Sequence, residues 1–512
     1  MIGHTPFTNE PLYTATVDSE YGYPVLRMYE MERVRAVTYQ MDFFLPEDSK
    51  SLLCRMRVTN EKDQVVPMYW WSNIAVPEYP EGRIVMPADS AYSFIFDENN
   101  RGSVQKVDIP YVDGVDVSHY CNIEKQVDYF FDLDKSPIKF LAQTDKEGFG
   151  LMHLSTSRLR SRKMFSWGNN VGSDSWQNFL TDKAGRYLEV QAGVGKTQYG
   201  CIPMPPNSSW EWIESYGPIQ LDATKDWEDF KAEATNKATT IFNTLNAETL
   251  LKESRATIAK KKGKLIQTGS PASGFARYLR PSEGRRVLTS QLEFPLDKAL
   301  YDNMLSLLEE GKVVACNTQE PPKAYFNEDE IFSALLAQKD RTWDMDYNLA
   351  LLYYYKEEFK LSQMFALSSI EKEKNVWAYH ALAATYFKLG DTKKSAKSIL
   401  EAVKLRSNSL PILREAFKLL LKINCYKEAI ELYEDISNKE IKSDLRLTTA
   451  YMISLYKEER YSEAYALISK DGGLVPDDIR EGNDEIETIY QDLITKLKLD
   501  TTVPNKVKFR SL

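Results

Sequence analysis

The stretch NVWAYHALAATYFKLGDTKKSAKSILEAVKLRS, residues 375–407, decides the fold of the C-terminal part of this chain. Small and aromatic residues recur along it at helical spacing: Tyr379, Leu382, Ala383, Tyr386, Gly390, Ser395 and Ala402. Small residues let two antiparallel helices approach closely, and aromatic side chains fill the gaps beside them. The stretch therefore predicts two antiparallel helices joined by a turn.

The same pattern repeats along the chain. A small residue opens the second helix of each expected pair, at Ser362, Ser395, Ala429 and Ala464, with spacings of 33, 34 and 35 residues. This period resembles that of tetratricopeptide repeats, which is about 34 residues. One pair cannot bury its apolar face alone, so neighbouring pairs must stack. Residues 331–512 are therefore predicted to form a tetratricopeptide-like array.

Residues 1–221 show a different periodicity, typical of strands. Short runs rich in β-branched and aromatic residues recur: Ala36–Leu45, Leu52–Thr59, Val66–Trp71, Tyr92–Phe96, Val127–Leu133, Ile138–Gln143, Gly150–Ser155, Tyr187–Gly193 and Ser209–Tyr216. No helical pattern separates them, so a doubly wound α/β fold is excluded. Strands at this spacing indicate antiparallel sheets packed as a sandwich.

Residues 222–330 are predicted to form a helical and irregular connector between these two parts. Apolar residues at helical spacing predict one helix over Asp226–Lys252, and a short helix is expected at Asp297–Glu310. The segments Gly269-Ser270-Pro271 and Pro321-Pro322 break regular structure between and after these helices.

Composition narrows the classes of function. The 512 residues carry a formal net charge of −9, and an acidic surface repels phosphate backbones, which argues against a nucleic-acid partner. No apolar stretch is long enough to span a membrane, and the N-terminus lacks the features of a secretory signal. The five cysteines are scattered without a CxxC pair, which argues against a structural zinc site and favours a reducing cytoplasm. No nucleotide-binding or other cofactor motif is found.

A family resemblance rests on residues between 163 and 218. They contain Lys163, Trp167-Gly168, Trp176, Leu180-Thr181-Asp182, Gly185, Tyr187, Glu189, Gln198, Glu214 and Pro218. Upstream, Trp70-Trp71-Ser72-Asn73 adds paired aromatic residues before an asparagine. In this order the residues resemble a bacterial family, a domain of unknown function that precedes tetratricopeptide arrays.

The resemblance implies a galactose-mutarotase-like β-supersandwich. Carbohydrate contact is the usual use of that fold, although one fold can host several functions. Members of the family begin upstream of Met1, so the resemblance also implies a shortened member. The expected fold class is therefore an antiparallel β-supersandwich followed by an α-helical solenoid.

Candidate site residues follow from alternation within the expected strands. Period two places Tyr187, Glu189 and Gln191 on one face of their strand. Glu189, Gln191 and Gln198 could together bind sugar hydroxyls. The alternative is that they form an ordinary solvent-exposed face of the sheet. His153 titrates near neutrality and is the candidate acid beside Glu189, unless it is a hydrogen-bonded core histidine. Glu214 is the third candidate for acid–base chemistry because it matches the family position.

The remaining candidates would bind rather than react. Trp70, Trp167 and Trp176 offer flat faces for sugar stacking, although a sandwich core uses the same residues. Trp70 and Trp71 should point to opposite faces, so at most one of them meets a ligand. Asn73 and Lys163 complete the set. Lys163 closes a basic run with Arg158, Arg160 and Arg162, which is either a solvated loop or a site for an acidic or phosphorylated sugar.

Two hypotheses of function remain open. In the first, the sandwich binds a mono- or oligosaccharide, with or without processing it as a hydrolase or epimerase would, and needs no cofactor or metal. In the second, the chain is a non-enzymatic scaffold in which the repeats bind a protein partner and the sandwich is a structural cap.

Overall fold

The computed structural model describes residues 8–96, 102–280, 287–312, 316–322, 326, 328–480 and 482–511. Met1, on which the expectation of a shortened member depends, lies outside these ranges. The chain forms two compact units, one of residues 1–296 with 510–512 and one of residues 297–509. The residues expected to form the connector, 222–330, are thus shared between the two units.

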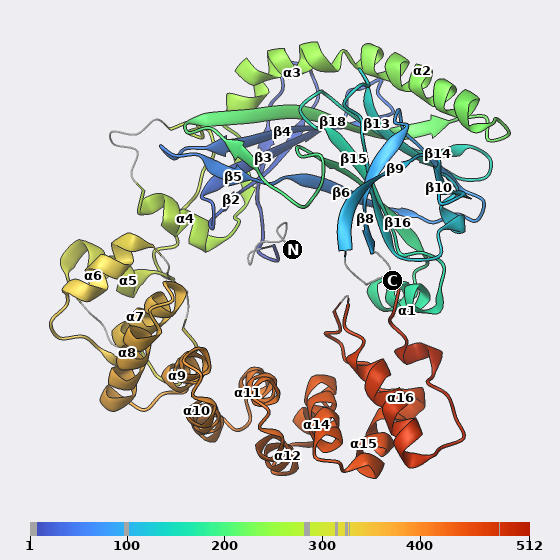
Figure 1. Ribbon diagram of the computed structural model, residues 1–512. Helices are drawn as coiled ribbons and strands as arrows, with labels where there is room; N and C mark the ends of the chain where they lie inside the picture. Colours follow the sequence, from blue (N-terminus) through green and yellow to red (C-terminus); the bar gives the residue numbers. More distant parts are fainter. Residues whose placement is uncertain are drawn as a thin grey trace. The chain divides into compact units, whose positions relative to one another are not determined.

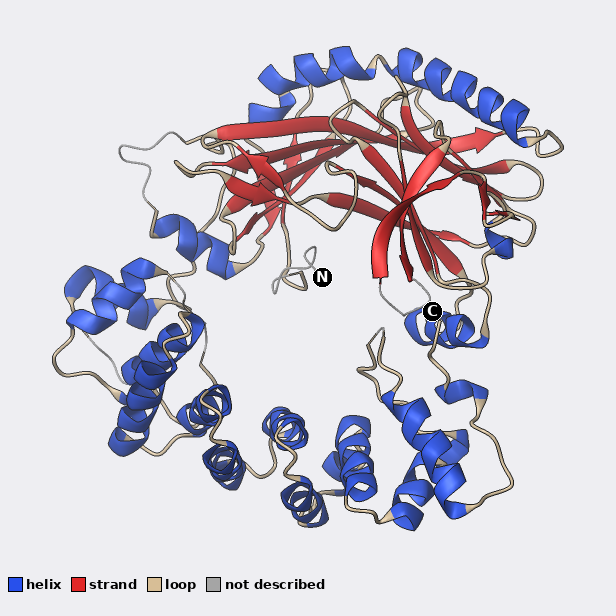
Figure 2. Cartoon of the chain, viewed as in Figure 1, coloured by secondary structure: helices blue, strands red, loops and turns tan. Residues whose placement is uncertain are grey.

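Two large antiparallel sheets build the first unit (Figure 2). The nine-stranded sheet has the order β19 (Lys264–Gln267), β1 (Tyr13–Val17), β2 (Val25–Glu32), β3 (Val37–Phe44), β4 (Leu52–Asn60), β18 (Ser208–Gln220), β14 (Phe149–Ser155), β13 (Lys139–Thr144) and β7 (Arg83–Val85). The six-stranded sheet has the order β6 (Trp71–Pro77), β16 (Tyr187–Gly193), β15 (Ser161–Ser166), β12 (Val127–Phe131), β8 (Ser90–Phe96) and β9 (Gly102–Asp108). Two short ladders pair β10 (Tyr111–Val112) with β11 (Val115–Asp116) and β17 (Ile202–Met204) with β5 (Val66–Met68).

Alternation along the strands explains how the sheets face each other. In β16, Leu188, Val190 and Ala192 are at most 3% exposed, whereas the intervening Glu189 is only half-buried. Successive strand residues point to opposite faces, so the apolar set lies in the core and the polar set on the other face. The predicted fold class, an antiparallel β-supersandwich followed by a helical solenoid, is confirmed.

Helices cover the other face of the nine-stranded sheet. Figure 1 shows α2 (Trp227–Leu245) and α3 (Ala247–Ala256) lying across β18, β13 and β14. The prediction of one continuous helix over Asp226–Lys252 was wrong. Asn246 adopts a left-handed conformation with φ of 47°, which ends α2 and starts α3 in a new direction.

Other elements were not predicted. The expected all-β region contains α1 (Val171–Thr181), which Asn170 caps by accepting a hydrogen bond from the backbone N–H of Ser173. Within the connector, β19 pairs with β1 at the edge of the nine-stranded sheet, and α4 (Pro271–Tyr278) follows it. The helix expected at Asp297–Glu310 begins later, as α5 (Asp302–Glu310).

The second unit consists of paired helices. After α5 and α6 (Asp329–Ala337) come α7 (Trp343–Tyr355), α8 (Phe359–Lys372), α9 (Val376–Lys388), α10 (Thr392–Leu405), α11 (Leu410–Lys422), α12 (Tyr426–Glu434), α13 (Lys439–Lys442), α14 (Leu445–Lys457), α15 (Tyr461–Ile468) and α16 (Glu485–Leu497). The four repeated small residues, Ser362, Ser395, Ala429 and Ala464, are all fully buried. Close approach at these positions confirms the tetratricopeptide-like pairing. None of the described helices combines the length and the apolar character that crossing a bilayer requires.

Candidate polar site on the six-stranded sheet

A row of polar side chains crosses the six-stranded sheet on the face turned away from the nine-stranded sheet. The strand register sets Asn73 of β6 beside Gln191 of β16, and Gln191 beside Lys163 of β15. The next partner along the row is Phe130 of β12. Directly paired residues of antiparallel strands share a face, so these side chains meet although they come from distant parts of the sequence.

A continuous chain of hydrogen bonds joins this row. Asn73 Nδ2 and Gln191 Nε2 each donate to Glu189 Oε2, both at 2.7 Å. Gln198 Nε2 donates to Gln191 Oε1, and Lys163 Nζ donates to Gln198 Oε1, both at 2.8 Å. Lys163 Nζ also lies 2.6 Å from Asp128 Oδ1. We call these residues the outer-face cluster: Asn73, Asp128, Lys163, Glu189, Gln191 and Gln198.

Charge within the outer-face cluster is nearly balanced. Lys163 is 5% exposed, and its ammonium group lies over the rings of Phe130 and Phe165, 5.3 and 5.5 Å from their centroids. Asp128 neutralises it at close range, so Glu189 supplies the remaining negative charge. Only one oxygen of Glu189, Oε2, is used by partners in the described part of the chain. Its Oε1 therefore remains available to accept a hydrogen bond from a ligand.

Aromatic rings border the outer-face cluster. The Trp71 ring lies 5.6 Å from Phe130, edge to face, and Tyr199 contacts Phe130 at 5.5 Å. Tyr199 is 44% exposed, so its ring is open to solvent beside the polar row. Gly193, paired with Trp71, makes this arrangement possible, because a Cβ atom there would come within 2.3 Å of the indole ring.

His153 and Glu214 lie elsewhere, between the two sheets. His153 of β14 and Glu214 of β18 are 2% and 1% exposed, and His153 Nε2 is 3.0 Å from Glu214 Oε2. Trp212 Nε1 and the Tyr216 hydroxyl also donate to Glu214, both at 2.8 Å. The structure therefore brings His153 together with Glu214 and not with Glu189.

The pKa shifts of this buried pair favour a neutral imidazole and an ionised carboxylate. Burial, and then the positive charge of Arg162, lower the pKa of His153 against the opposing effect of Glu214. Burial alone would raise the pKa of Glu214, but donors led by His153 outweigh it and lower that pKa. A neutral His153 that donates through Nε2 leaves Nδ1 as an acceptor, and Nδ1 has no partner among the described residues.

The three tryptophans that were expected to stack on a ligand point into the interior of the protein instead. Trp70 packs against Trp212 with centroids 6.0 Å apart. Trp167 and Trp176 stack on each other at 5.6 Å and are 4% and 2% exposed. Of the adjacent pair it is Trp71 that lies beside the polar row, and alternation alone could not distinguish the two.

Sequence reasoning also missed Asp128, Phe130 and Tyr199. Asp128 and Phe130 lie at alternate positions of a strand that was predicted, but nothing local shows that β12 pairs with β15. Among the described residues, no group of three His, Cys, Asp or Glu side chains could hold a metal ion. The outer-face cluster is thus suited to hydrogen bonding and ring stacking with a polar ligand.

Comparison with known proteins supports the fold of both units. Residues 1–221 match the family model described as "Domain of unknown function (DUF5107)", which confirms the resemblance seen in the sequence. A crystal structure of a TPR-domain containing protein from Parabacteroides distasonis ATCC 8503 matches with a TM-score of 0.65 and 15% sequence identity, over 99% of this chain and 78% of that chain. A galactose mutarotase-like protein from Clostridium acetobutylicum matches over 41% of this chain and 67% of its own, with 13% identity and a TM-score of 0.30.

Proposed function

We propose that this protein binds a carbohydrate at the outer-face cluster. Residues 1–221, which match the DUF5107 family model, fold as a β-supersandwich that is followed in the sequence by helical repeats. One observation carries the proposal: a hydrogen-bonded row of a carboxylate, three amides and an ammonium group lies beside aromatic rings. Sugars combine hydroxyl groups, which donate and accept, with apolar ring faces that stack on aromatic side chains.

The charge of the cluster favours a neutral sugar over an acidic one. Lys163 is already engaged by Asp128 and Gln198, and the remaining charge belongs to Glu189. An anionic ligand would meet that carboxylate without a free cation to compensate. A sugar hydroxyl, in contrast, can donate to Glu189 Oε1 while Tyr199 contacts the ring.

Binding is the core of the proposal, and Glu189 is the group that would act as a base in any reaction. Proton transfer to or from a sugar ring needs positioned acid and base groups within hydrogen-bond reach of the reacting atoms. His153, the acid suggested by the sequence, lies between the sheets and is bonded to Glu214. We therefore assign His153 and Glu214 to the stability of the sandwich and Glu189 to the ligand.

The test is thermal unfolding of the full chain against a panel of neutral, acidic and phosphorylated sugars. A ligand at 100 times its dissociation constant should stabilise the protein by about 2.7 kcal/mol. We expect a selective shift with a neutral sugar that is lost in Trp71→Ala and in Asn73→Ala. Gln105→Ala is the matched control, because Gln105 is an exposed amide on the edge strand β9 of the same sheet. No shift with any sugar, or an equal shift in Asn73→Ala, would contradict the proposal.

A second candidate function, protein binding by the repeat unit, rests on α8. Leu361, Met364 and Leu367 are 37%, 50% and 42% exposed and recur every three residues, which places them along one side of the helix. Exposed apolar side chains gathered in this way are typical of protein-interaction surfaces. The test is affinity purification of the full chain beside Met364→Glu. A partner held by the wild type and lost from the variant would support this function.

A further inference from the structure

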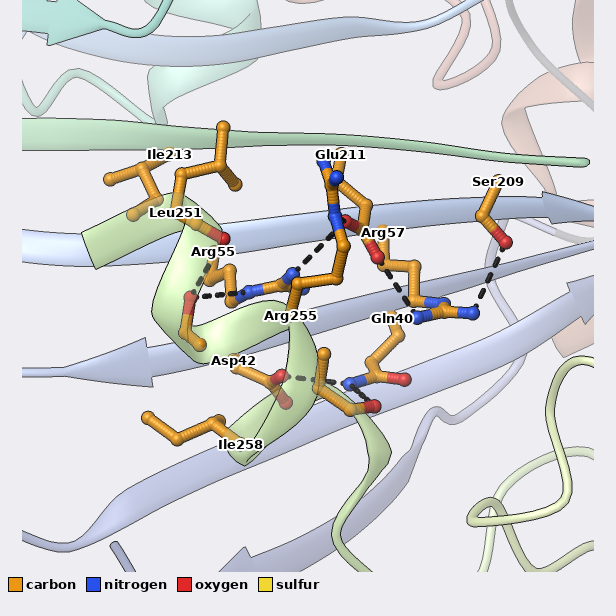
Figure 3. A network of polar contacts seen from close by, with 12 residues as sticks. Gln40, Asp42, Arg55, Arg57, Ser209, Glu211, Ile213, Leu251, Arg255 and Ile258 are labelled. Atoms are coloured by element: carbon orange, nitrogen blue, oxygen red, sulfur yellow. Dashed lines mark hydrogen bonds and ion pairs between the residues drawn. The ribbon is translucent and has the colours of Figure 1, made fainter. Parts of the chain in front are cut away.

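The carboxylate of Glu211 pairs with three guanidinium groups, one of which, that of Arg255, belongs to α3 (Figure 3). Glu211 of β18 is 7% exposed. Its Oε1 accepts from Arg57 Nη1 at 2.9 Å, and its Oε2 accepts from Arg255 Nε at 2.5 Å. Arg55 Nη2 lies 3.3 Å from the same Oε2. One negative charge therefore faces three positive charges, two of which belong to buried side chains.

The neighbouring ion pair leaves the excess of positive charge unchanged, because Asp42, which lies beside Arg55, adds one negative charge and Arg27 adds one positive charge. Asp42, the other buried carboxylate in Figure 3, forms a two-point pair with Arg27, at 2.6 and 3.2 Å.

Buried donors in this cluster are also left without acceptors. Arg55 is fully buried, and its Nε donates to Ser254 Oγ of α3 at 2.9 Å. Its Nη1 has no hydrogen-bond partner in the described part of the chain, and neither does Nε of Arg57. An unpaired charged donor in a protein interior is costly, and such donors normally meet a water molecule or an anion. Here the excess of positive charge favours the anion.

We propose that Arg55, Arg57 and Arg255 form a binding site for a phosphate group, carried by inorganic phosphate or by a small phosphorylated metabolite. Guanidinium groups present planar pairs of donors that match phosphate oxygens, and several arginines together hold a dianion better than one does. Arg255 connects this cluster to the surface, because its side chain is 57% exposed.

This site is separate from the outer-face cluster. Glu211 lies on the face of the nine-stranded sheet that α3 covers, whereas the outer-face cluster belongs to the other sheet. The proposal therefore does not depend on carbohydrate binding. Each site can fail without the other, and a protein with both would bind a neutral sugar and a phosphate group independently.

The test is titration of the full chain with inorganic phosphate, with sodium chloride added to keep the ionic strength constant. Calorimetry and thermal unfolding are the readouts. We expect saturable binding and a rise in Tm that chloride does not reproduce. Arg255→Gln should weaken phosphate binding about tenfold or more, because a hydrogen bond to a charged group is lost.

Arg160→Gln is the matched control, because Arg160 is 54% exposed and lies 3.8 Å from a carboxylate oxygen of Asp134. It should bind phosphate as the wild type does. Tighter binding of a hexose phosphate than of inorganic phosphate would assign the site to phosphorylated metabolites, and equal binding would assign it to the free ion. The proposal would be overturned if phosphate had no effect beyond that of chloride, or if Arg255→Gln bound phosphate with the affinity of the wild type. The buried donors would then be hydrogen-bonded to water.

Discussion

His153 Nε2 of β14 lies 3.0 Å from Glu214 Oε2 of β18, with both side chains sealed between the two sheets. The register places Ser155 beside Glu214 and His153 beside Tyr216, so the pair is a diagonal contact across adjacent strands. Arg162 of the opposite sheet donates to Ser155 Oγ at 2.7 Å. A polar layer of alternating charge thus connects the two sheets inside an otherwise apolar core.

This layer predicts a pH dependence of stability near neutrality. The pKa of His153 is lowered in the folded protein, mainly by burial, whereas an unfolded histidine titrates near 6.5. Below that pH the unfolded chain binds a proton that the folded chain does not, so the free energy of unfolding falls as the pH falls. The slope from this group reaches at most about 1.4 kcal/mol per pH unit.

Chemical unfolding of the full chain between pH 5 and 7.5 measures this slope. His153→Gln should be less stable than the wild type at pH 7.5 and show a flatter pH dependence below 6.5. His380→Gln is the control, because His380 is 41% exposed. An unchanged slope in His153→Gln would show that other groups cause the dependence.

Glu189 should contribute strongly to sugar binding and little to the free energy of unfolding. Its side chain is half-buried and accepts two hydrogen bonds from neutral amides. Glu189→Gln keeps the size of the side chain but removes the charge. The affinity for the sugar identified in the panel should fall about tenfold, since hydrogen bonds to charged groups are stronger than those to neutral ones. Isothermal titration measures the change, and the free energy of unfolding should change by less than about 1 kcal/mol.

Gly193→Ala tests whether the position of Trp71 matters. The new Cβ would lie 2.3 Å from the indole ring, so the ring must move away from the sheet, while Asn73 and Glu189 keep their backbone positions. We expect a loss of sugar affinity similar to that of Trp71→Ala, with a moderate loss of stability of about 1–3 kcal/mol from overpacking. Isothermal titration of Gly193→Ala and of the wild type with the same sugar measures the difference in affinity. Wild-type affinity in Gly193→Ala would remove Trp71 from the site.

The sequence predicted those features that depend on local periodicity. The repeat of small residues at Ser362, Ser395, Ala429 and Ala464 placed the helix pairs correctly because close packing requires small residues at those points. Alternation within Tyr187–Gly193 placed Glu189 and Gln191 on one face, as the structure shows. Both are properties of one element or of one repeated unit.

Features that depend on strand order could not be predicted in this way. His153 and Glu214 are 61 residues apart and meet because β14 pairs with β18, which no local pattern indicates. Helix α1 was missed for a different reason. Its buried positions include Gly172, Ser173 and Gln177 beside Trp176, so it shows no apolar stripe of helical period.

The repeat unit contains a buried carboxylate whose removal should be costly. Asp346 in the first turn of α7 is 0% exposed. It accepts hydrogen bonds from Arg341 Nε at 2.7 Å and from Ser368 Oγ at 2.6 Å, and it also pairs with Lys372. Burial alone would raise its pKa, but Lys372, Ser368 and Arg341 outweigh that effect and lower it. Asp346 thus ties α7 to α8 at the start of the array.

Asp346→Asn should destabilise the second unit by about 1–3 kcal/mol, because charge-assisted hydrogen bonds are lost and two basic partners remain. Asp329→Asn is the matched control. Asp329 is 86% exposed and pairs with Lys356 on the surface, so its removal should cost less than about 1 kcal/mol. Because the folded pKa of Asp346 is depressed, its contribution is fully present above an unfolded pKa of about 3.9 and is lost as the pH falls through the folded value. Hydrogen exchange of the α7 and α8 amides at pH 6 measures the effect locally. Equal protection in Asp346→Asn and Asp329→Asn would show that packing alone, rather than this carboxylate, holds the first helix pair together.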